Sequence, residues 1–190
     1  MVTLCIVEKA SVAKKFAYAL FGKNFVKGNV GKATYYVGNV RDRQVIITPL
    51  AGYIYEIDYP RELRVKWEYP LFIDPSNLEV NLDPEKKDYA DAINEICSKY
   101  NIDTIVVGTD YDVEGSNLGL LALSQLCGLP PDYVPKGNEK YSFYRMKFSA
   151  LTPEEIRRAF YNLEALDSSR GQAGKARMII DFLVGTNITR

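Results

Sequence analysis

The chain has 190 residues, of which 47% are hydrophobic and 25% charged, and its formal net charge is zero. This composition is typical of a globular protein, and no run of about 18 apolar residues could cross a bilayer. The first residues lack the features of a secretory signal, so we expect a cytoplasmic protein without a membrane partner. Histidine is absent and the three cysteines are far apart in the sequence, so any metal must be held by oxygen ligands.

The charges are unevenly distributed along the chain. Residues 1–53 carry eight Lys or Arg against two acids, residues 54–114 carry six against fifteen, and the other 76 residues carry ten against seven. Basic ends and an acidic middle could place phosphate-binding and metal-binding surfaces side by side. Surface charges sorted by chance explain the same count equally well.

The first predicted elements are a strand and a helix. Residues 3–8, "TLCIVE", have the apolar run of a buried strand. Residues 11–22 have apolar side chains at every fourth position, with Ser11 as the expected N-cap and Gly22 just beyond the helix end. Residues 34–60 contain β-rich runs punctuated by Gly and Pro, and an irregular stretch is expected after them.

A second strand and helix pair follows in the middle of the chain. Asp83 and Pro84 open a helix with one apolar face, and residues 103–109, "DTIVVGT", form a short buried strand. Residues 115–128 are predicted to be a helix that ends at Gly128.

The last third alternates in the same way. A Pro-rich loop at 129–140 leads to a strand of alternating pattern at 141–149. Residues 152–160 are expected to form a helix that opens with a capping box between Thr152 and Glu155. Alternating strands and helices imply an α/β fold with a largely parallel sheet covered on both faces, in which ligands bind at the carboxyl ends of the strands.

Charged side chains follow two of the predicted strands. Asp110, Asp112 and Glu114 come directly after the second buried strand, and Glu8 and Lys9 come directly after the first. Carboxylates gathered at a strand end are suited to Mg²⁺, which prefers oxygen ligands. A solvated loop and an ordinary surface pair are the alternatives, because acids at this spacing recur by chance in roughly one chain in three.

Four stretches together resemble a known family. "IVEKASVAKKFAYALFG", "VVGTDYDVEGSNLG", "YRMKFSALTPEEIRRAF" and "ARMIIDFLVGTNITR" look like the amino-terminal part of a type IA DNA topoisomerase of the archaeal and topoisomerase-III-like branch. The resemblance implies a Toprim domain at residues 1–150, a Rossmann-like, mostly parallel sheet flanked by helices. It also implies that residues 151–190 begin a helical DNA-groove domain that is truncated here.

The resemblance also implies roles for particular residues. Glu8 and Lys9 would be catalytic, with Glu8 as the acid or base and Lys9 stabilising charge on the phosphate. Glu8 would also join the three carboxylates of the second strand end, Asp110, Asp112 and Glu114, as a ligand of Mg²⁺.

The resemblance implies that Arg177 and Asp181 line a groove for single-stranded DNA, with Arg145 near the cleavage centre, and Lys14 is a further expected DNA-binding residue. Without the resemblance, Arg177 and Asp181 would be an ordinary intrahelical pair. Ser168, Ser169 and Gly171 suggest a linker before the last helix.

Some positions depart from the family pattern. Val113 and Ser116 stand where the family often has Arg and Glu, and Tyr53 stands in a segment where it often has His. The family's nucleophilic tyrosine lies in a Pro-Arg-Thr-Asp context that this chain lacks, although it contains 14 tyrosines.

We therefore expect the amino-terminal fragment of a topoisomerase, inactive alone, that supports cleavage and religation of single-stranded DNA by a tyrosine outside these residues. Its partners would be single-stranded DNA and the remainder of the topoisomerase chain, with no oligomer expected. The alternatives are a freestanding Toprim phosphodiesterase or primase-like protein that uses metal-activated water, and a non-catalytic nucleic-acid-binding module.

Overall fold

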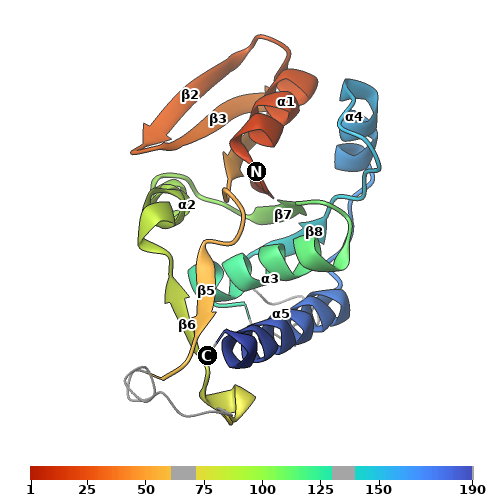
Figure 1. The fold of residues 1–190 in the computed structure, drawn as a ribbon. Coiled ribbons are helices and arrows are strands. Elements are labelled where there is room, and N and C mark those ends of the chain that lie inside the picture. The colour runs from red at the N-terminus through yellow and green to blue at the C-terminus, as the bar shows by residue number, and fades with distance from the viewer. Residues whose placement is uncertain (61–71, 130–139, 190) are drawn as a thin grey trace.

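The computed structural model describes residues 1–60, 72–129 and 140–189 (Figure 1). A large sheet has the strand order β2-β3-β4-β1-β7-β8-β9, and a second sheet pairs β5 with β6. The strands are β1 (Val2–Val7), β2 (Phe25–Val30), β3 (Ala33–Val40), β4 (Arg43–Pro49), β5 (Tyr55–Asp58), β6 (Glu79–Leu82), β7 (Thr104–Gly108), β8 (Ser142–Arg145) and β9 (Glu164–Ala165). The helices are α1 (Ala10–Phe21), α2 (Lys87–Lys99), α3 (Val113–Cys127), α4 (Pro153–Tyr161) and α5 (Ser168–Ile188), with short 3-10 helices at Pro75–Asn77 and Pro84–Lys86.

The centre of the large sheet is parallel. Strands β4, β1, β7 and β8 run in the same direction, and the outer pairs β2-β3, β3-β4 and β8-β9 are antiparallel. Parallel neighbours need a crossover connection, which the helices that follow β1 and β7 supply. The predicted fold class, a mostly parallel α/β sheet flanked by helices, is confirmed.

Helices cover both faces of the large sheet (Figure 1). Leu4 and Ile6 of β1 point into a core cluster that includes residues of α2 and α3. Cys5 and Val7, the alternate residues, point into a second cluster that includes residues of α1 and α4. Because successive side chains of a strand point to opposite faces, a strand buried on both sides is expected to be apolar, as the run "LCIV" of β1 is.

Helix α5 packs closely on α3 (Figure 1). A Cβ atom built on Gly171 would lie 2.7 Å from the Leu120 side chain, and one built on Gly174 would lie 2.5 Å from the Val113 carbonyl oxygen. The prediction of a linker at residues 168–171 is therefore wrong, because these residues form the first turn of α5, where Asp167 caps the amide of Ser169.

Several predicted boundaries also shift. Ser11 is not the N-cap of α1, because the extended residue Lys9 occupies that position and its carbonyl oxygen accepts the amides of Val12 and Ala13. Gly22 ends α1 with a φ of 63°, as predicted. The strand expected at 141–149 is shorter and ends at Arg145.

Other expectations fall partly outside the described residues. The irregular stretch expected up to residue 82 contains β6, and its residues 61–71 are not described. Most of the Pro-rich loop, residues 130–139, is also outside the description. Strand β2 was not predicted, because its sequence "FVKGNV" has a Lys and a Gly that obscure the apolar pattern. No helix in the described part of the chain is long and apolar enough to cross a membrane.

Candidate active site

Two strand ends meet at one edge of the sheet. Strands β1 and β7 are parallel neighbours, and Val7 pairs with Gly108 at their carboxyl ends. Glu8 and Lys9 therefore leave the sheet beside the segment that leads to Asp110. The sequence placed charged residues after both strands, and the parallel register explains why they come together.

Glu8 and Lys9 form an ion pair. Lys9 Nζ lies 2.8 Å from Glu8 Oε1, and the Glu8 side chain is 17% exposed whereas that of Lys9 is 64% exposed. The hydrogen bond to Glu8 is the main cause that raises the pKa of Lys9, and the negative charges of Asp110 and Glu114 add to it. The ammonium group of Lys9 thus stands within the field of carboxylates from both strand ends.

Asp112 has a structural task at the start of α3. It is the N-cap residue, and its Oδ1 accepts the amide of Gly115 at 2.6 Å. Gly115 is needed here, because an added Cβ would lie 2.2 Å from the carbonyl oxygen of Asp110. The turn is therefore compact, and one carboxylate oxygen of Asp112 already has a partner.

The four predicted metal ligands do not form a closed metal site. Across residues 1–60, 72–129 and 140–189, no group of three Cys, Asp or Glu side chains is arranged to hold a metal ion. The prediction that the three carboxylates of the second strand end converge is thus too strong. The reason is that Glu8 is paired with Lys9, and Asp112 turns back to cap α3. Mg²⁺ keeps several waters and needs only one or two carboxylates, so this oxygen donor set fits a hydrated ion.

Tyr53 is a member of the site that the sequence did not reveal. Its hydroxyl accepts a hydrogen bond from Asn117 Nδ2 at 3.0 Å and donates one to the carbonyl oxygen of Glu114 at 3.3 Å. Partial burial is the main cause that raises the pKa of Tyr53, and three carboxylates raise it further. These belong to Glu114, Asp112 and Glu8. The available sequence signal for Tyr53 as a site residue was its position, because the family often has His, another polar ring, in this segment.

Arg145 lies beneath the acidic loop and is 4% exposed. Its guanidinium donates to Thr109 Oγ1 at 2.6 Å, to the carbonyl oxygen of Asp110 at 2.5 Å and to that of Val107 at 3.4 Å. Burial lowers its pKa to about 10. Its donors thus hold the backbone that carries Asp110, and little of the side chain faces solvent; contact of Arg145 with DNA stays a prediction.

Other cations surround the ring of Tyr111, which lies between the two aspartates. The charged groups of Lys147 and Arg170 lie 5.0 Å and 4.6 Å from its centroid. An open cavity of about 670 Å³ beside them is lined by Asp110, Asp112, Lys147 and Arg158, among others. Positive side chains thus adjoin the carboxylates, a combination suited to a phosphate backbone.

The last helix contributes to a second cleft. Arg177 and Asp181 form an exposed intrahelical pair at 3.6 Å, and both line a cleft of about 290 Å³ together with Glu114 and Tyr53. The two readings of this pair are compatible, because it is a helical ion pair that also borders the candidate site. Exposed pairs of this kind contribute little to stability.

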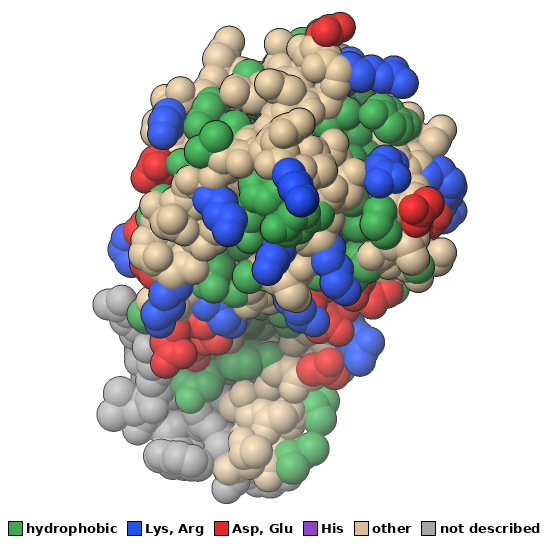
Figure 2. All heavy atoms as spheres, turned by 90° about the horizontal axis from the view of Figure 1, so that it is seen from above, with side chains coloured by type: hydrophobic (Ala, Val, Ile, Leu, Met, Phe, Trp, Pro, Cys, Tyr) green, Lys and Arg blue, Asp and Glu red, His purple; other side chains and the backbone are tan. Residues whose placement is uncertain are grey.

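Lys14 belongs to a broader basic surface. It is exposed on α1, about 7 Å along the helix axis from Lys9. All eight Lys and Arg of residues 1–53 are exposed. Figure 2 shows Lys and Arg side chains spread over the face seen from above, with acidic side chains mainly toward its margins. The basic character of the first segment is thus present as surface charge.

The fold and this arrangement define the class of protein. The Toprim domain family matches residues 3–151, so the chain belongs to the Toprim family.

Comparison with similar proteins shows which Toprim proteins this chain resembles. The chain is 34% identical, over 97% of its length, to DNA topoisomerase 1 of Methanothermobacter thermautotrophicus, and 32% identical, over 98%, to that of Pyrococcus furiosus. It is 28% identical, over 98% of its length, to DNA topoisomerase 3 of Dictyostelium discoideum. The chain spans 24%, 17% and 22% of these proteins, respectively. The resemblance to type IA DNA topoisomerases, inferred from the motifs, is confirmed.

A solved structure agrees at the level of the fold. Topoisomerase I from Thermotoga maritima superposes with a TM-score of 0.55 over 94% of this chain and 24% of that chain, at 21% identity. At this identity the similarity concerns the fold alone.

Proposed function

We propose that the chain is the Toprim-bearing, amino-terminal part of a type IA DNA topoisomerase, acting on single-stranded DNA. The observation that carries the proposal is the meeting of Glu8 and Lys9 with Asp110 and Glu114 at one sheet edge. It is supported by the match to topoisomerases over nearly the whole chain. We place the Toprim domain at residues 1–150 and the start of the DNA-groove domain at 151–190.

Cleavage needs a nucleophile that this chain does not supply in the family's context. A tyrosine elsewhere in the complete enzyme would attack the phosphorus, forming a 5'-phosphotyrosyl bond while the bond to the 3'-oxygen breaks. Lys9 is suited to stabilise charge on that phosphate, because its exposed ammonium can move from Glu8 to a new anion. The tyrosine hydroxyl loses a proton as it attacks, and Glu8 is the group placed to pass that proton to the leaving 3'-oxygen and to return it to the tyrosine during religation.

Mg²⁺ bound at this edge would supply positive charge that holds the DNA phosphates for religation. Asp110 and Glu8 are the residues that would hold it, with Asp112 and Glu114 as additional oxygen donors. Tyr53 would fix the position of Glu114 through its hydrogen bond to the backbone. Arg177 and Lys14 would contact the backbone of the strand without reading its sequence.

Metal binding can be tested on the 190-residue chain. Calorimetric titration with Mg²⁺ should give weak binding, about millimolar or slightly tighter, because few protein ligands are supplied. The double variant Asp110→Asn with Asp112→Asn should lose it, whereas Glu154→Gln, an exposed carboxylate on α4, should retain it. Unchanged binding in the double variant would show that the ligands are misassigned.

The activity itself needs the complete gene product that contains this chain. It should relax negatively supercoiled plasmid and form a covalent DNA adduct, and Lys9→Ala should slow adduct formation by about 100-fold or more. The matched control is Lys15→Ala, an exposed lysine of the same helix region. Metal-dependent nicking without an adduct would instead favour the phosphodiesterase alternative.

A further inference from the structure

A separate cavity lies at the opposite end of the large sheet. It has a volume of about 460 Å³, and Thr3, at the start of β1, is part of its wall. Glu8 follows the other end of the same strand, roughly 15 Å away at the rise of an extended chain. The other lining residues come from the β3-β4 turn and the end of α4: Val40, Arg41, Asp42, Arg43, Phe160, Tyr161 and Leu163.

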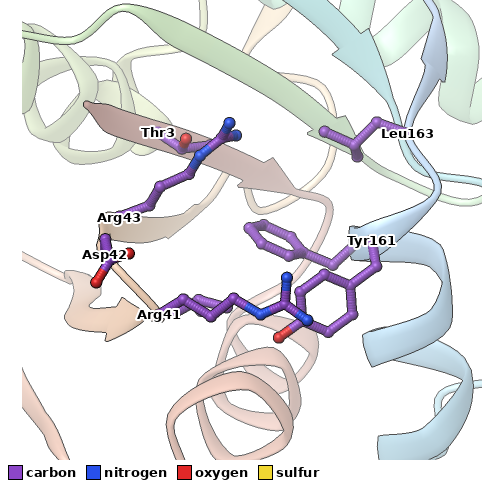
Figure 3. Close-up of a pocket in the computed structure, with 8 residues that line it drawn as sticks. Thr3, Arg41, Asp42, Arg43, Tyr161 and Leu163 are labelled. Carbon is purple, nitrogen blue, oxygen red and sulfur yellow. The ribbon is translucent and has the colours of Figure 1, made fainter.

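Two arginines give the cavity its charge. In Figure 3 the side chain of Arg41 extends from the turn to Tyr161, that of Arg43 extends toward Thr3, and Asp42 stays at the turn. Neither guanidinium has an ion pair or a hydrogen bond with any residue in the described part of the chain, and both side chains belong to exposed residues. Their donors are therefore available to an anion.

An aromatic ring accompanies these charges. The guanidinium carbon of Arg41 lies 4.8 Å from the centroid of the Tyr161 ring, in a cation–π arrangement (Figure 3). Tyr161 is 51% exposed, although it is a large aromatic residue. A ring partly open to solvent beside an oriented guanidinium can stack a planar base, as in proteins that bind single strands.

The backbone of Arg41 is a further sign that its side chain is used. Val40 pairs with Arg43, so Arg41 and Asp42 form a two-residue hairpin loop, and Arg41 has a φ of 53°. Glycine is the residue that occupies such a conformation without strain. A long cation held in this conformation points to a task for its guanidinium, because strained positions gather at functional sites.

We propose that this cavity binds a nucleotide unit, with Arg41 and Arg43 on the phosphate and Tyr161 against the base. The guanidinium forks match phosphate geometry, and the aromatic wall adds a preference that a bare phosphate or an acidic peptide would not use. The nucleotide is either free or part of a single strand that passes the amino ends of the sheet. The site is independent of the proposed active site, so either assignment can fail while the other holds.

The test uses the 190-residue chain and two probes, deoxythymidine monophosphate and a fluorescein-labelled oligodeoxythymidine. Anisotropy at low salt measures oligonucleotide affinity, and NMR amide shifts at Thr3, Val40 and Leu163 report occupation of the cavity by either probe. Arg41→Gly should weaken binding at this site by about tenfold. This substitution removes the guanidinium and places a glycine where the backbone has a positive φ. The variant should therefore stay folded, and a loss of binding can be assigned to the missing cation.

Tyr161→Ala should weaken binding of both probes by several-fold, about what one stacking contact supplies. The matched control is Lys27→Gln, which removes an exposed cation from edge strand β2. Shifts with the monophosphate support the free nucleotide, and shifts with the oligonucleotide alone support the strand. No shifts at the cavity with either probe, or equal losses in Arg41→Gly and Lys27→Gln, would overturn the proposal.

Discussion

Replacing Arg145 tests whether it holds the acidic loop in place. The side chain is buried at the end of β8, and its guanidinium donates to Thr109 and to the carbonyl oxygens of Asp110 and Val107. We compare Arg145→Met, which removes the charge and keeps an apolar stem, with Arg145→Lys, which keeps the charge. Because lysine has the same charge and a similar length, it would ordinarily be expected to be the milder replacement.

The energies of burial and of the hydrogen bonds predict the reverse order, with Arg145→Met as the milder change. Burial lowers the pKa of Arg145 from 12.5 to about 10, which corresponds to a cost of about 3.5 kcal/mol at about 1.4 kcal/mol per pKa unit. Two short hydrogen bonds from a charged donor contribute about 1.5 kcal/mol each, and the long one about 0.5 kcal/mol. These terms nearly cancel, so Arg145→Met should lower the free energy of unfolding by only about 1 kcal/mol.

Arg145→Lys should cost about 3 kcal/mol. A buried ammonium is more strongly hydrated than a guanidinium, and its single nitrogen replaces the two that reach Thr109 and Asp110 separately. Urea unfolding of both variants at pH 7, followed by circular dichroism, measures the difference. If Arg145→Lys is the more stable of the two, the view of Arg145 as a fork that holds two backbone positions is wrong.

Three further outcomes follow from the contacts. Gly174→Ala should destabilise the chain by about 2 kcal/mol, because a Cβ would meet the α3 backbone. Gly185→Ala on the same helix, with no atom within 4 Å of its Cβ, should be neutral or stabilising in thermal unfolding. The hydrogen bond from Arg158 lowers the pKa of Glu155 from 4.5 to about 2. The stabilising contribution of this carboxylate should therefore be fully present above about pH 4.5 and be lost as the pH falls through about 2, and an NMR pH titration of the Glu155 side chain checks the lowered pKa. Arg177→Ala should weaken single-strand binding equally for all sequences and reduce its salt dependence, and an effect confined to one sequence would contradict backbone contact.

The fold could be predicted from the sequence where local pattern and tertiary packing agree. The apolar runs of β1 and β7 each lead into a helix, and the parallel register then brings Glu8 and Asp110 to one edge. Gly22 and Gly128 were correctly assigned to helix ends, because both adopt the positive φ that glycine tolerates. Strand β2 was missed because its stability comes from pairing with β3, which no local pattern encodes.

The side-chain contacts of the candidate site were harder to predict from the sequence than the fold. Nothing in the sequence near Tyr53 indicates that its hydroxyl reaches Asn117, 64 positions later. The same holds for Arg145, whose partners lie 35 to 38 positions earlier. Spacing also suggested that Asp112 is simply a ligand, whereas the helix that follows requires an N-cap at this residue. Side chains that serve both local structure and a site cannot be assigned to one of them by spacing alone.

Arg145 and Lys9, two cations beside the carboxylates, differ in a way that separates their roles. Arg145 is buried, bonded through separate nitrogens and unable to leave without exposing unsatisfied partners. Lys9 is exposed and pairs with Glu8 through one flexible stem, and attraction between exposed charges is weak in water. An arriving phosphate can therefore take Lys9 from Glu8 but cannot take Arg145 from its loop. The edge of the sheet thus combines a fixed charge that shapes the acidic segment with a mobile one that can follow a substrate.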